Sequence, residues 1–271
     1  MKIITLIDNV VYDKYLTGEH GFSLLIEDGK EKILFDTGQS GNFICNAKIL
    51  GIDISQVNSV VISHGHYDHT GGLLEFIKFN KKAKIYIKRE AFYKKCKDKE
   101  FIGISLNKSI IEEKIIYTGK EISLSENITI IPDIKIYNEI DTHFESMFIN
   151  DNNNYIQDKF EDEQFLLINN KKGLTIISGC SHRGISNIIK TATSKFNLPI
   201  DYVIGGFHLK NEKKQKVRNI INLLKDFKIK NIGVSHCTGI EYLQLIKDLT
   251  TANVFYNYTG NVINLGSDKI I

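Results

Sequence analysis

The stretch Val60–Gly72, VVISHGHYDHTGG, joins a run of mostly β-branched apolar residues to a segment rich in histidine. A short apolar run of this kind is typical of a buried strand. Four side chains that bind metals well follow it: His64, His66, Asp68 and His69. Residues two apart face the same side of an extended chain, so His64 and His66 can bind one ion from a strand end. The stretch therefore predicts a metal site.

The residues after the two leading histidines extend this prediction. Asp68 and His69 are expected in the turn that follows the strand, where they would face a second ion, as in two-metal hydrolases. Thr70 is expected to cap a helix that begins at Gly71 and Gly72, whose missing side chains would leave room beside the metals. A polar loop that is rich in histidine by accident is the alternative. The length of the motif favours the metal site.

The pattern H-x-H-x-D-H after an apolar strand resembles the metallo-β-lactamase superfamily. The resemblance implies an α/β fold, a four-layer αββα sandwich that binds one or two divalent ions, usually zinc and in some members iron or manganese. The chain has 271 residues, is 42% hydrophobic and contains only two prolines. Since no Pro/Gly/Ser-rich linker interrupts it, we expect residues 1–271 to form a single domain made of two αβ halves.

Composition narrows the class of partner. The net charge is only +3, and lysines are mixed with glutamates, which argues against binding to nucleic acid or membranes. The four cysteines show no C-x-x-C or disulfide-like pattern, which indicates a reducing compartment. No signal-like or membrane-length apolar segment is present. We therefore expect a cytoplasmic protein that acts on a small molecule; the sequence carries no signal for its oligomeric state.

Strands and helices are predicted to alternate around the motif. The predicted elements are a strand at Lys2–Ile7, a hairpin at Phe22–Asp36 that turns at Asp28-Gly29, a helix at Asn42–Leu50, a strand at Val57–Ser63, a helix at Leu73–Phe79 and a strand at Lys84–Ile87. Asp36 ends the hairpin and could simply cap the loop. The superfamily has an aspartate here that orients a metal-binding histidine, so the resemblance favours that role for Asp36.

The middle of the chain has weaker signals. A lysine-rich helix is expected after Ala91, and short strands at Ile115–Tyr117 and Ile128–Ile131. Asp151–Glu163, DNNNYIQDKFEDE, is predicted to be a long polar loop. Such a loop can determine substrate specificity or be a disordered surface segment, and both interpretations remain open.

Three apolar strands in the second half each run into a histidine. The strands Leu174–Ser178, Tyr202–Ile204 and Ile232–Ser235 are followed by His182, His208 and His236, and then by a helix. Ligands of open α/β sheets collect at the carboxyl ends of strands, so these side chains should converge on one edge. For His208 alone, a core position satisfied by hydrogen bonds is an equal alternative.

Two cysteines accompany these histidines. Cys180 and His182 are two apart, so both could be ligands from one face of extended chain. In one subclass of the zinc β-lactamases a cysteine at this place binds the second ion, and thiolate is a good zinc ligand. A small buried apolar role is the alternative for Cys180. His236 resembles the closing histidine of the superfamily, whereas Cys237 is expected to pack.

One superfamily histidine is missing. It should lie near Phe160–Leu166, where this chain has FEDEQFL. His182 or an acidic residue, Asp162 or Glu163, would have to replace it, and we favour His182. The expected ligands are then His64, His66 and His182 for one ion, and Asp68, His69, Cys180 and His236 for the other.

Five motifs indicate one branch of the superfamily. These motifs are EHGFS at Glu19–Ser23, DEQFL at Asp162–Leu166, SGCSHRG at Ser178–Gly184, GGFHL at Gly205–Leu209 and HCTG at His236–Gly239. They resemble the branch labelled dihydropterin ribofuranosyl-aminobenzene phosphate synthase-like, also described as metallo-β-lactamase-fold hydrolases. The resemblance implies a metal-dependent hydrolase that uses a metal-bound water or hydroxide on a small substrate, with or without a phosphate.

Further residues are expected to serve this chemistry. Asp68 would also accept the proton of the nucleophile. Arg183, His208 and Lys210 could bind a phosphate or stabilise negative charge, although a solvated surface position is the alternative for the two basic residues. His20, in an early loop, is expected at the mouth of the site as a substrate-binding residue.

Other functions are compatible with parts of the pattern. The main alternative is a synthase that joins a dihydropterin to a ribofuranosyl-aminobenzene phosphate, with Phe207 or Tyr155 beside the pterin ring. A di-iron redox protein would usually have glutamate in place of His66 and a flavin domain. A non-catalytic metal-binding module would not need so complete a ligand set.

Overall fold

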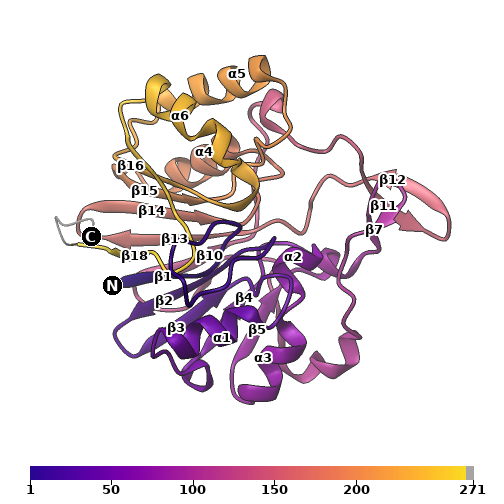
Figure 1. Ribbon diagram of the computed structural model, residues 1–271. Helices are drawn as coiled ribbons and strands as arrows, with labels where there is room; N and C mark the ends of the chain where they lie inside the picture. The colour runs from indigo at the N-terminus through magenta and orange to yellow at the C-terminus, as the bar shows by residue number, and fades with distance from the viewer. Residues whose placement is uncertain (267–271) are drawn as a thin grey trace. The chain divides into compact units, whose positions relative to one another are not determined.

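The computed structural model describes residues 1–266, and these divide into two compact units. Unit 1 contains Met1–Gly119, Glu145–Asp162 and the segment that begins at Tyr258; unit 2 contains Lys120–Phe144 and Glu163–Asn257. Each unit is built on a seven-stranded sheet of its own (Figure 1).

The sheet of unit 1 has the order β18-β1-β2-β3-β4-β5-β8. Its strands are β1 (Lys2–Ile7), β2 (Ser23–Asp28), β3 (Glu31–Phe35), β4 (Ser59–Val61), β5 (Lys84–Ile87), β8 (Ile115–Tyr117) and β18 (Val262–Asn264). The first four in this order pair antiparallel, and β3, β4, β5 and β8 pair in parallel. The predicted hairpin is confirmed, and Gly29 turns it with a positive φ of 63°.

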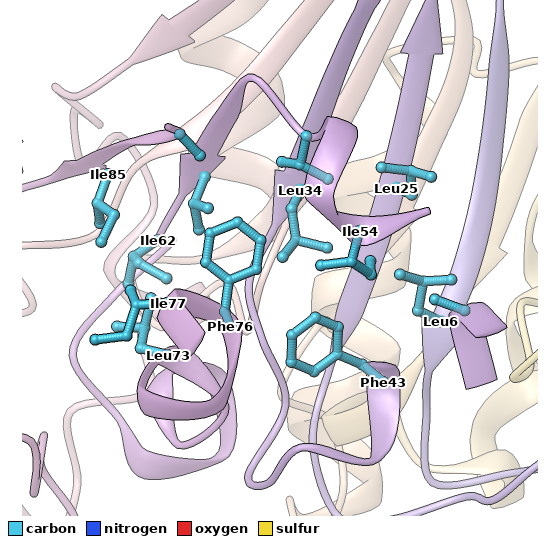
Figure 2. Packing of buried hydrophobic residues seen from close by; sticks show 14 of the residues in the cluster. Leu6, Leu25, Leu34, Phe43, Ile54, Ile62, Leu73, Phe76, Ile77 and Ile85 are labelled. Carbon is cyan, nitrogen blue, oxygen red and sulfur yellow. The ribbon is translucent and has the colours of Figure 1, made fainter. Parts of the chain in front are cut away.

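Helices of unit 1 pack on this sheet through apolar side chains spaced three or four residues apart. Helices α1 (Asn42–Ile49) and α3 (Leu73–Phe79) place Phe43 and Phe76 against Leu25 and Leu34 of the sheet, and all four are fully buried (Figure 2). Burial of each such side chain contributes about 1.5–3 kcal/mol. This core fixes the neighbourhood of β4, the strand from which the histidine motif emerges.

A second, four-stranded sheet of unit 1 corrects two predictions. It consists of β6 (Lys95–Lys97), β7 (Glu100–Phe101), β11 (Met147–Asp151) and β12 (Asn154–Gln157). The helix expected after Ala91 is wrong, because only a 3₁₀ turn, η2 (Arg89–Phe92), precedes β6. The long loop expected at Asp151–Glu163 is wrong over β12. Asn152 and Asn153, with φ of 50° and 69°, form a hairpin turn between β11 and β12, and asparagine tolerates such angles.

The sheet of unit 2 has the order β17-β16-β15-β14-β13-β10-β9. Its strands are β9 (Ile122–Ser123), β10 (Ile128–Ile131), β13 (Phe165–Asn170), β14 (Gly173–Ser178), β15 (Ile200–Gly205), β16 (Asn231–Val234) and β17 (Asn253–Tyr256). Strands β14 to β17 are parallel. The helices between them are α4 (Ile185–Lys195), α5 (Lys214–Lys225) and α6 (Leu243–Leu249) (Figure 1).

Short helical segments complete the chain between these elements. They are α2 (Tyr67–Thr70), η1 (Ile54–Gln56), η3 (Lys108–Ile110), η4 (Glu112–Lys114), η5 (Glu139–Asp141), η6 (His236–Thr238) and η7 (Ile240–Tyr242). The alternation of strand and helix in both units confirms the predicted α/β fold. Within residues 1–266, no helix combines the length and apolar character needed to cross a bilayer.

Candidate metal centre

The histidines that follow β4 lie together in unit 1. His64, His66 and His69 are all buried, with exposed fractions of 0%, 6% and 0%. The ring centroids of His64 and His66 are 4.5 Å apart, and those of His64 and His69 are 4.3 Å apart. The motif therefore folds into one compact imidazole cluster at the carboxyl end of β4.

The local backbone of the motif differs from the prediction. Asp68 lies in the short helix α2, not in a turn, and Thr70 caps no following helix because its hydroxyl donates to the His66 carbonyl at 2.8 Å. A Cβ on Gly71 would lie 2.1 Å from the Gln39 carbonyl oxygen, and one on Gly72 would also meet backbone. The glycines thus allow close approach of the neighbouring loop.

Asp36 holds Nδ1 of His69 directly, and Nδ1 of His64 through the Ser63 hydroxyl. Its Oδ2 lies 2.7 Å from Nδ1 of His69 and accepts a hydrogen bond from the Ser63 hydroxyl at 2.7 Å. The Ser63 hydroxyl is also 2.9 Å from Nδ1 of His64. A contact at Nδ1 of this kind fixes the ring orientation and is typical of histidines that bind a metal through Nε2. The structure thus gives Asp36 the contact expected of a residue that orients a metal-binding histidine.

Burial favours the neutral form of His64. Desolvation of the buried ring lowers the pKa of His64 well below its ordinary value, and the neighbouring His69 and His66 lower it further. Neutral imidazole is the form that binds metal ions.

His20 reaches the same cluster from the early loop. Its Nε2 lies 3.3 Å from the Asp68 carboxylate, and its Nδ1 lies 3.3 Å from the side-chain amide of Asn9. Asp68 is also 3.9 Å from Nε2 of His69. The predicted site residues His20, Asp68 and His69 of unit 1 therefore lie close together. Asn9, which was not predicted, contacts His20.

A buried ion-pair cluster contacts the backbone of the histidine motif at Gly65. Lys95 is only 1% exposed, and its ammonium group lies 2.5 Å from Asp158 and 2.8 Å from Asp162. Desolvation opposes its charge, but the charges of Asp162 and Asp158 raise the pKa of Lys95 above its ordinary value. The second oxygen of Asp162 accepts the Gly65 amide at 2.7 Å, between the first two histidines of the motif.

This cluster was missed in the sequence. Lysine is almost never buried without a partner, and the partners of Lys95 lie 63 and 67 residues away. The contacts of Asp162 argue against its role as a substitute metal ligand, because both of its oxygens already hold groups of unit 1.

Glu163 has a comparable role in unit 2. Its two carboxylate oxygens accept the backbone amides of His182 and Arg183, at 2.6 and 2.7 Å. It therefore fixes the loop after β14 through backbone.

The donors of unit 2 also converge at strand ends, as predicted for that half. Cys180 and His236 are 3% and 1% exposed. One donor atom each of Cys180, His236 and Cys237 lies within 4.8 Å of the other two. Cys237 was expected only to pack, yet its sulfur belongs to this set.

His208 lies within a row of imidazole rings. Its ring centroid is 4.3 Å from that of His182 and 5.0 Å from that of His143, which the sequence analysis missed. Burial and the charge of His143 lower the pKa of His208 to about 3. His208 itself is half-buried, and its ring neighbours are these two imidazoles.

His143 is held by carboxylates. Its Nδ1 lies 2.8 Å from Glu212, and its Nε2 lies 3.8 Å from Asp141. Burial opposes a charged ring, but hydrogen bonds to Asp141 and Glu212 raise the pKa of His143. Burial also opposes ionisation of Glu212, but hydrogen bonds from His143 and Lys216 lower its pKa to about 2. No apolar strand precedes His143, so the signal that identified the other histidines was lacking.

The two basic candidates for phosphate binding have different surroundings. Nε of Arg183 donates to the Ile134 carbonyl at 3.1 Å, so part of its guanidinium serves structure. The Lys210 side chain is exposed, and its amide donates to the Cys237 carbonyl at 3.1 Å.

Strained backbone marks the strand ends that carry these residues. Asp36, Ser181, His208 and His236 have φ of 59°, 56°, 51° and 48°, in the left-handed region. Each such angle costs a non-glycine residue about 1–3 kcal/mol, and outliers of this kind cluster at functional sites.

The donor chemistry fits a divalent transition metal. The candidate donors are buried imidazoles, a carboxylate and thiols, and Nδ1 of His69 is already engaged by Asp36. Imidazole and thiolate suit zinc, whereas magnesium and calcium prefer oxygen ligands.

Comparison with known proteins agrees with this chemistry. The family described as the metallo-β-lactamase superfamily matches residues 16–125. The chain is 33% identical over 260 residues to 7,8-dihydropterin-6-methyl-4-(β-D-ribofuranosyl)-aminobenzene-5'-phosphate synthase of Methanocaldococcus jannaschii, covering 89% of this chain and 88% of that protein. It is 31% identical over 268 residues to an uncharacterised protein of the same organism, covering 96% and 98% of the two chains.

A solved structure is also similar over nearly the whole chain. The crystal structure of Tm1679, described as a metal-dependent hydrolase of the β-lactamase superfamily, is 30% identical with a TM-score of 0.88. The alignment covers 98% of this chain and 100% of that one.

Proposed function

Because the chain belongs to the metallo-β-lactamase superfamily, in the branch that includes the M. jannaschii synthase, we propose that it is a metal-dependent hydrolase of a small substrate, with or without a phosphate. The observation that supports it most is the buried imidazole cluster whose Nδ1 atoms are held by Asp36 and Ser63. Such an arrangement presents Nε2 atoms for metal binding.

The proposal draws donors from both units, which we take to form one domain. It rests on superfamily membership and on the identity of the donors, with zinc as the metal. The proposed ligands are His64, His66 and His182 for one ion, and Asp68, His69, Cys180 and His236 for the second. When bound, the metal supplies Lewis acidity and lowers the pKa of a water toward neutrality.

Other side chains would accept the proton of the nucleophilic water and hold the ligand-bearing loops in position. Asp68 is the proposed acceptor of the proton from the nucleophilic water, and His20 and Asn9 hold that carboxylate and its partner ring in place. Asp162 and Glu163 fix the two ligand-bearing loops through backbone amides. Precise placement of this kind is what the proposed reaction needs.

The test uses the zinc-loaded protein with generic phosphomonoesters, phosphodiesters and lactones. Hydrolysis of at least one class is expected. Asp68→Asn should lower kcat by about 100-fold or more, the contribution of a general base. Asp226→Asn, at an exposed aspartate after α5, is the matched control and should leave kcat unchanged. Absence of hydrolysis with all three classes, or an Asp68→Asn variant as active as wild type, would contradict the proposal.

A second candidate is the pterin-related synthase. The observation that favours it is the identity of 33% to the M. jannaschii synthase over 89% of this chain. Arg183 and Lys210 would then hold the phosphate of the ribofuranosyl-aminobenzene compound. The pterin ring would need another neighbour than Phe207, which is fully buried, whereas Tyr155 on β12 is 37% exposed.

The two candidates predict different requirements. The synthase forms its product only when a dihydropterin and the phosphoribosyl-aminobenzene compound are both present, which chromatography with mass detection measures. The hydrolase releases product from a phosphate ester without any pterin. Product that depends on the dihydropterin would replace the hydrolase proposal with the synthase.

A further inference from the structure

We propose that Cys237 is a metal donor, and that it forms a two-sulfur, one-nitrogen binding set in unit 2 with Cys180 and His236. The inference deepens the proposed function and rests on its metal binding, since Cys180 and His236 already belong to the proposed ligands. It adds a second thiolate and so specifies the class of metal.

The donor atoms are close to the spacing that an ion requires. One atom each of Cys180, His236 and Cys237 lies within 4.8 Å of the other two. Around tetrahedral zinc, with Zn–S near 2.3 Å and Zn–N near 2.0–2.1 Å, donor atoms are separated by about 3.5–3.8 Å. Side-chain rotations that move the atoms by about 1 Å are therefore sufficient to close the set on an ion.

The sheet of unit 2 brings the three residues together. Cys180 follows β14, and His236 and Cys237 follow β16, while β15 lies between these strands in the sheet. After β15 comes Gly206, on which a Cβ would lie 2.5 Å from the Cys237 sulfur. The absence of a side chain at Gly206 is what leaves space for the sulfur beside Cys180.

Little holds the Cys237 sulfur away from an ion. Its thiol donates to the Cys180 carbonyl at 3.6 Å, which keeps it at the loop after β14. A thiol is a weak hydrogen-bond donor, so deprotonation of Cys237 on metal binding loses only this weak hydrogen bond. The backbone of His236, with φ of 48°, is strained where the set is assembled.

Two thiolates and an imidazole favour a borderline-soft ion. Such a set suits zinc or cobalt and discriminates against magnesium and calcium, which take oxygen ligands. The other two cysteines of the chain are Cys45, which is exposed in α1, and Cys96, which is buried in β6. Cys45 therefore serves as a matched control.

The test follows thiolate binding by spectroscopy. The cobalt-loaded full-length protein is compared with Cys237→Ser, Cys180→Ser and the control Cys45→Ser. Bound thiolates give sulfur-to-cobalt charge-transfer absorption in the near ultraviolet. Two thiolates predict a loss of about half of the intensity per bound cobalt in each of the first two variants, because each removes one of two sulfur ligands. Cys45→Ser should match wild type.

A measurement on the wild-type protein covers the case in which a variant does not fold. Alkylation of each cysteine is followed by peptide mass spectrometry, with and without zinc. Zinc should protect Cys237 and Cys180 from the reagent, because bound thiolate reacts slowly, and leave Cys45 unprotected.

The outcomes separate this inference from the proposed function. Wild-type intensity in Cys237→Ser, or equal alkylation of Cys237 with and without zinc, overturns the inference while Cys180 and the metal proposal stand. Cobalt bound without any charge-transfer band removes both thiolates. Failure of the wild-type protein to bind cobalt or zinc at all overturns the proposed function itself.

Discussion

Replacement of Lys95 by methionine tests the energetics of the loop that carries the first two histidines. The ammonium group of Lys95 is buried and pairs with Asp158 and Asp162, and Asp162 in turn accepts the Gly65 amide. Methionine fills a similar volume without a charge, so the change leaves two buried carboxylates with no cation and creates no large cavity.

The expected loss follows from the burial of this cluster. Removal of one partner from a buried ion pair costs about 3–5 kcal/mol of unfolding free energy, because the remaining charge is uncompensated. Asp162, which accepts the Gly65 amide, also loses the cation that its other oxygen contacts. Burial already raises the pKa of Asp158 above its ordinary value, and loss of the Lys95 charge, which lowers it, raises that pKa further, so the destabilisation is greatest at neutral pH. It shrinks as the pH falls through that raised pKa.

Urea unfolding at neutral and mildly acidic pH measures this effect. Lys97→Met is the matched control, since Lys97 lies on the same strand, β6, with its side chain exposed. That control should change the unfolding free energy by no more than about 0.5 kcal/mol. A Lys95→Met protein as stable as Lys97→Met, or one whose deficit grows on acidification, would refute the reasoning.

Three further perturbations follow from the same contacts. Asp36→Asn removes the carboxylate that contacts His69, while asparagine still tolerates the φ of 59°. Zinc affinity, measured by competition titration, should therefore fall about 10–100-fold. Unchanged affinity would contradict the proposed role of Asp36 in orienting His69. Glu212 has its pKa lowered from 4.5 to about 2, equivalent to about 3 kcal/mol, which partial exposure reduces to about 1–2 kcal/mol. The stability difference between wild type and Glu212→Gln, measured by urea unfolding, should therefore be present above pH 4.5 and vanish as the pH falls toward 2, and a difference independent of pH would disagree. Gly72→Ala would place a Cβ 2.3 Å from the Thr37 carbonyl oxygen and should destabilise the protein by about 1–3 kcal/mol in urea, so wild-type stability would be inconsistent with the close approach.

Local patterns predicted much of the fold and part of the candidate site. Strands β5, β8 and β10 and helix α3 begin and end where the apolar spacing placed them. The clustering of His64, His66 and His69 followed from their position after a buried strand. These features depend on residues close in sequence, where periodicity carries the information.

Features that depend on distant partners were not accessible in this way. Lys95 lay within a predicted lysine-rich helix, and its two carboxylate partners, more than sixty residues away, could not be identified from the local pattern. His143 follows no apolar strand, and its partner Glu212 is 69 residues distant. The hairpin of β11 and β12 was hidden because its Asn152-Asn153 turn was interpreted only as polar loop.

The contact of Asp36 with His69 lies between these cases. Its position at a strand end is local, but the sequence alone allowed a simple loop cap. Resemblance to the superfamily was needed to favour the contact that the structure has, at 2.7 Å.

Metal content of the purified protein tests the central claim most directly. Elemental analysis of wild type, His66→Ala and the folded control Lys97→Met is made after equilibration with zinc and removal of free metal. We expect about two zinc ions per chain in wild type and in Lys97→Met. Because His66 is one of three proposed ligands of one ion, we expect about one zinc ion per chain in His66→Ala. Metal content in His66→Ala equal to that of wild type would contradict the central claim.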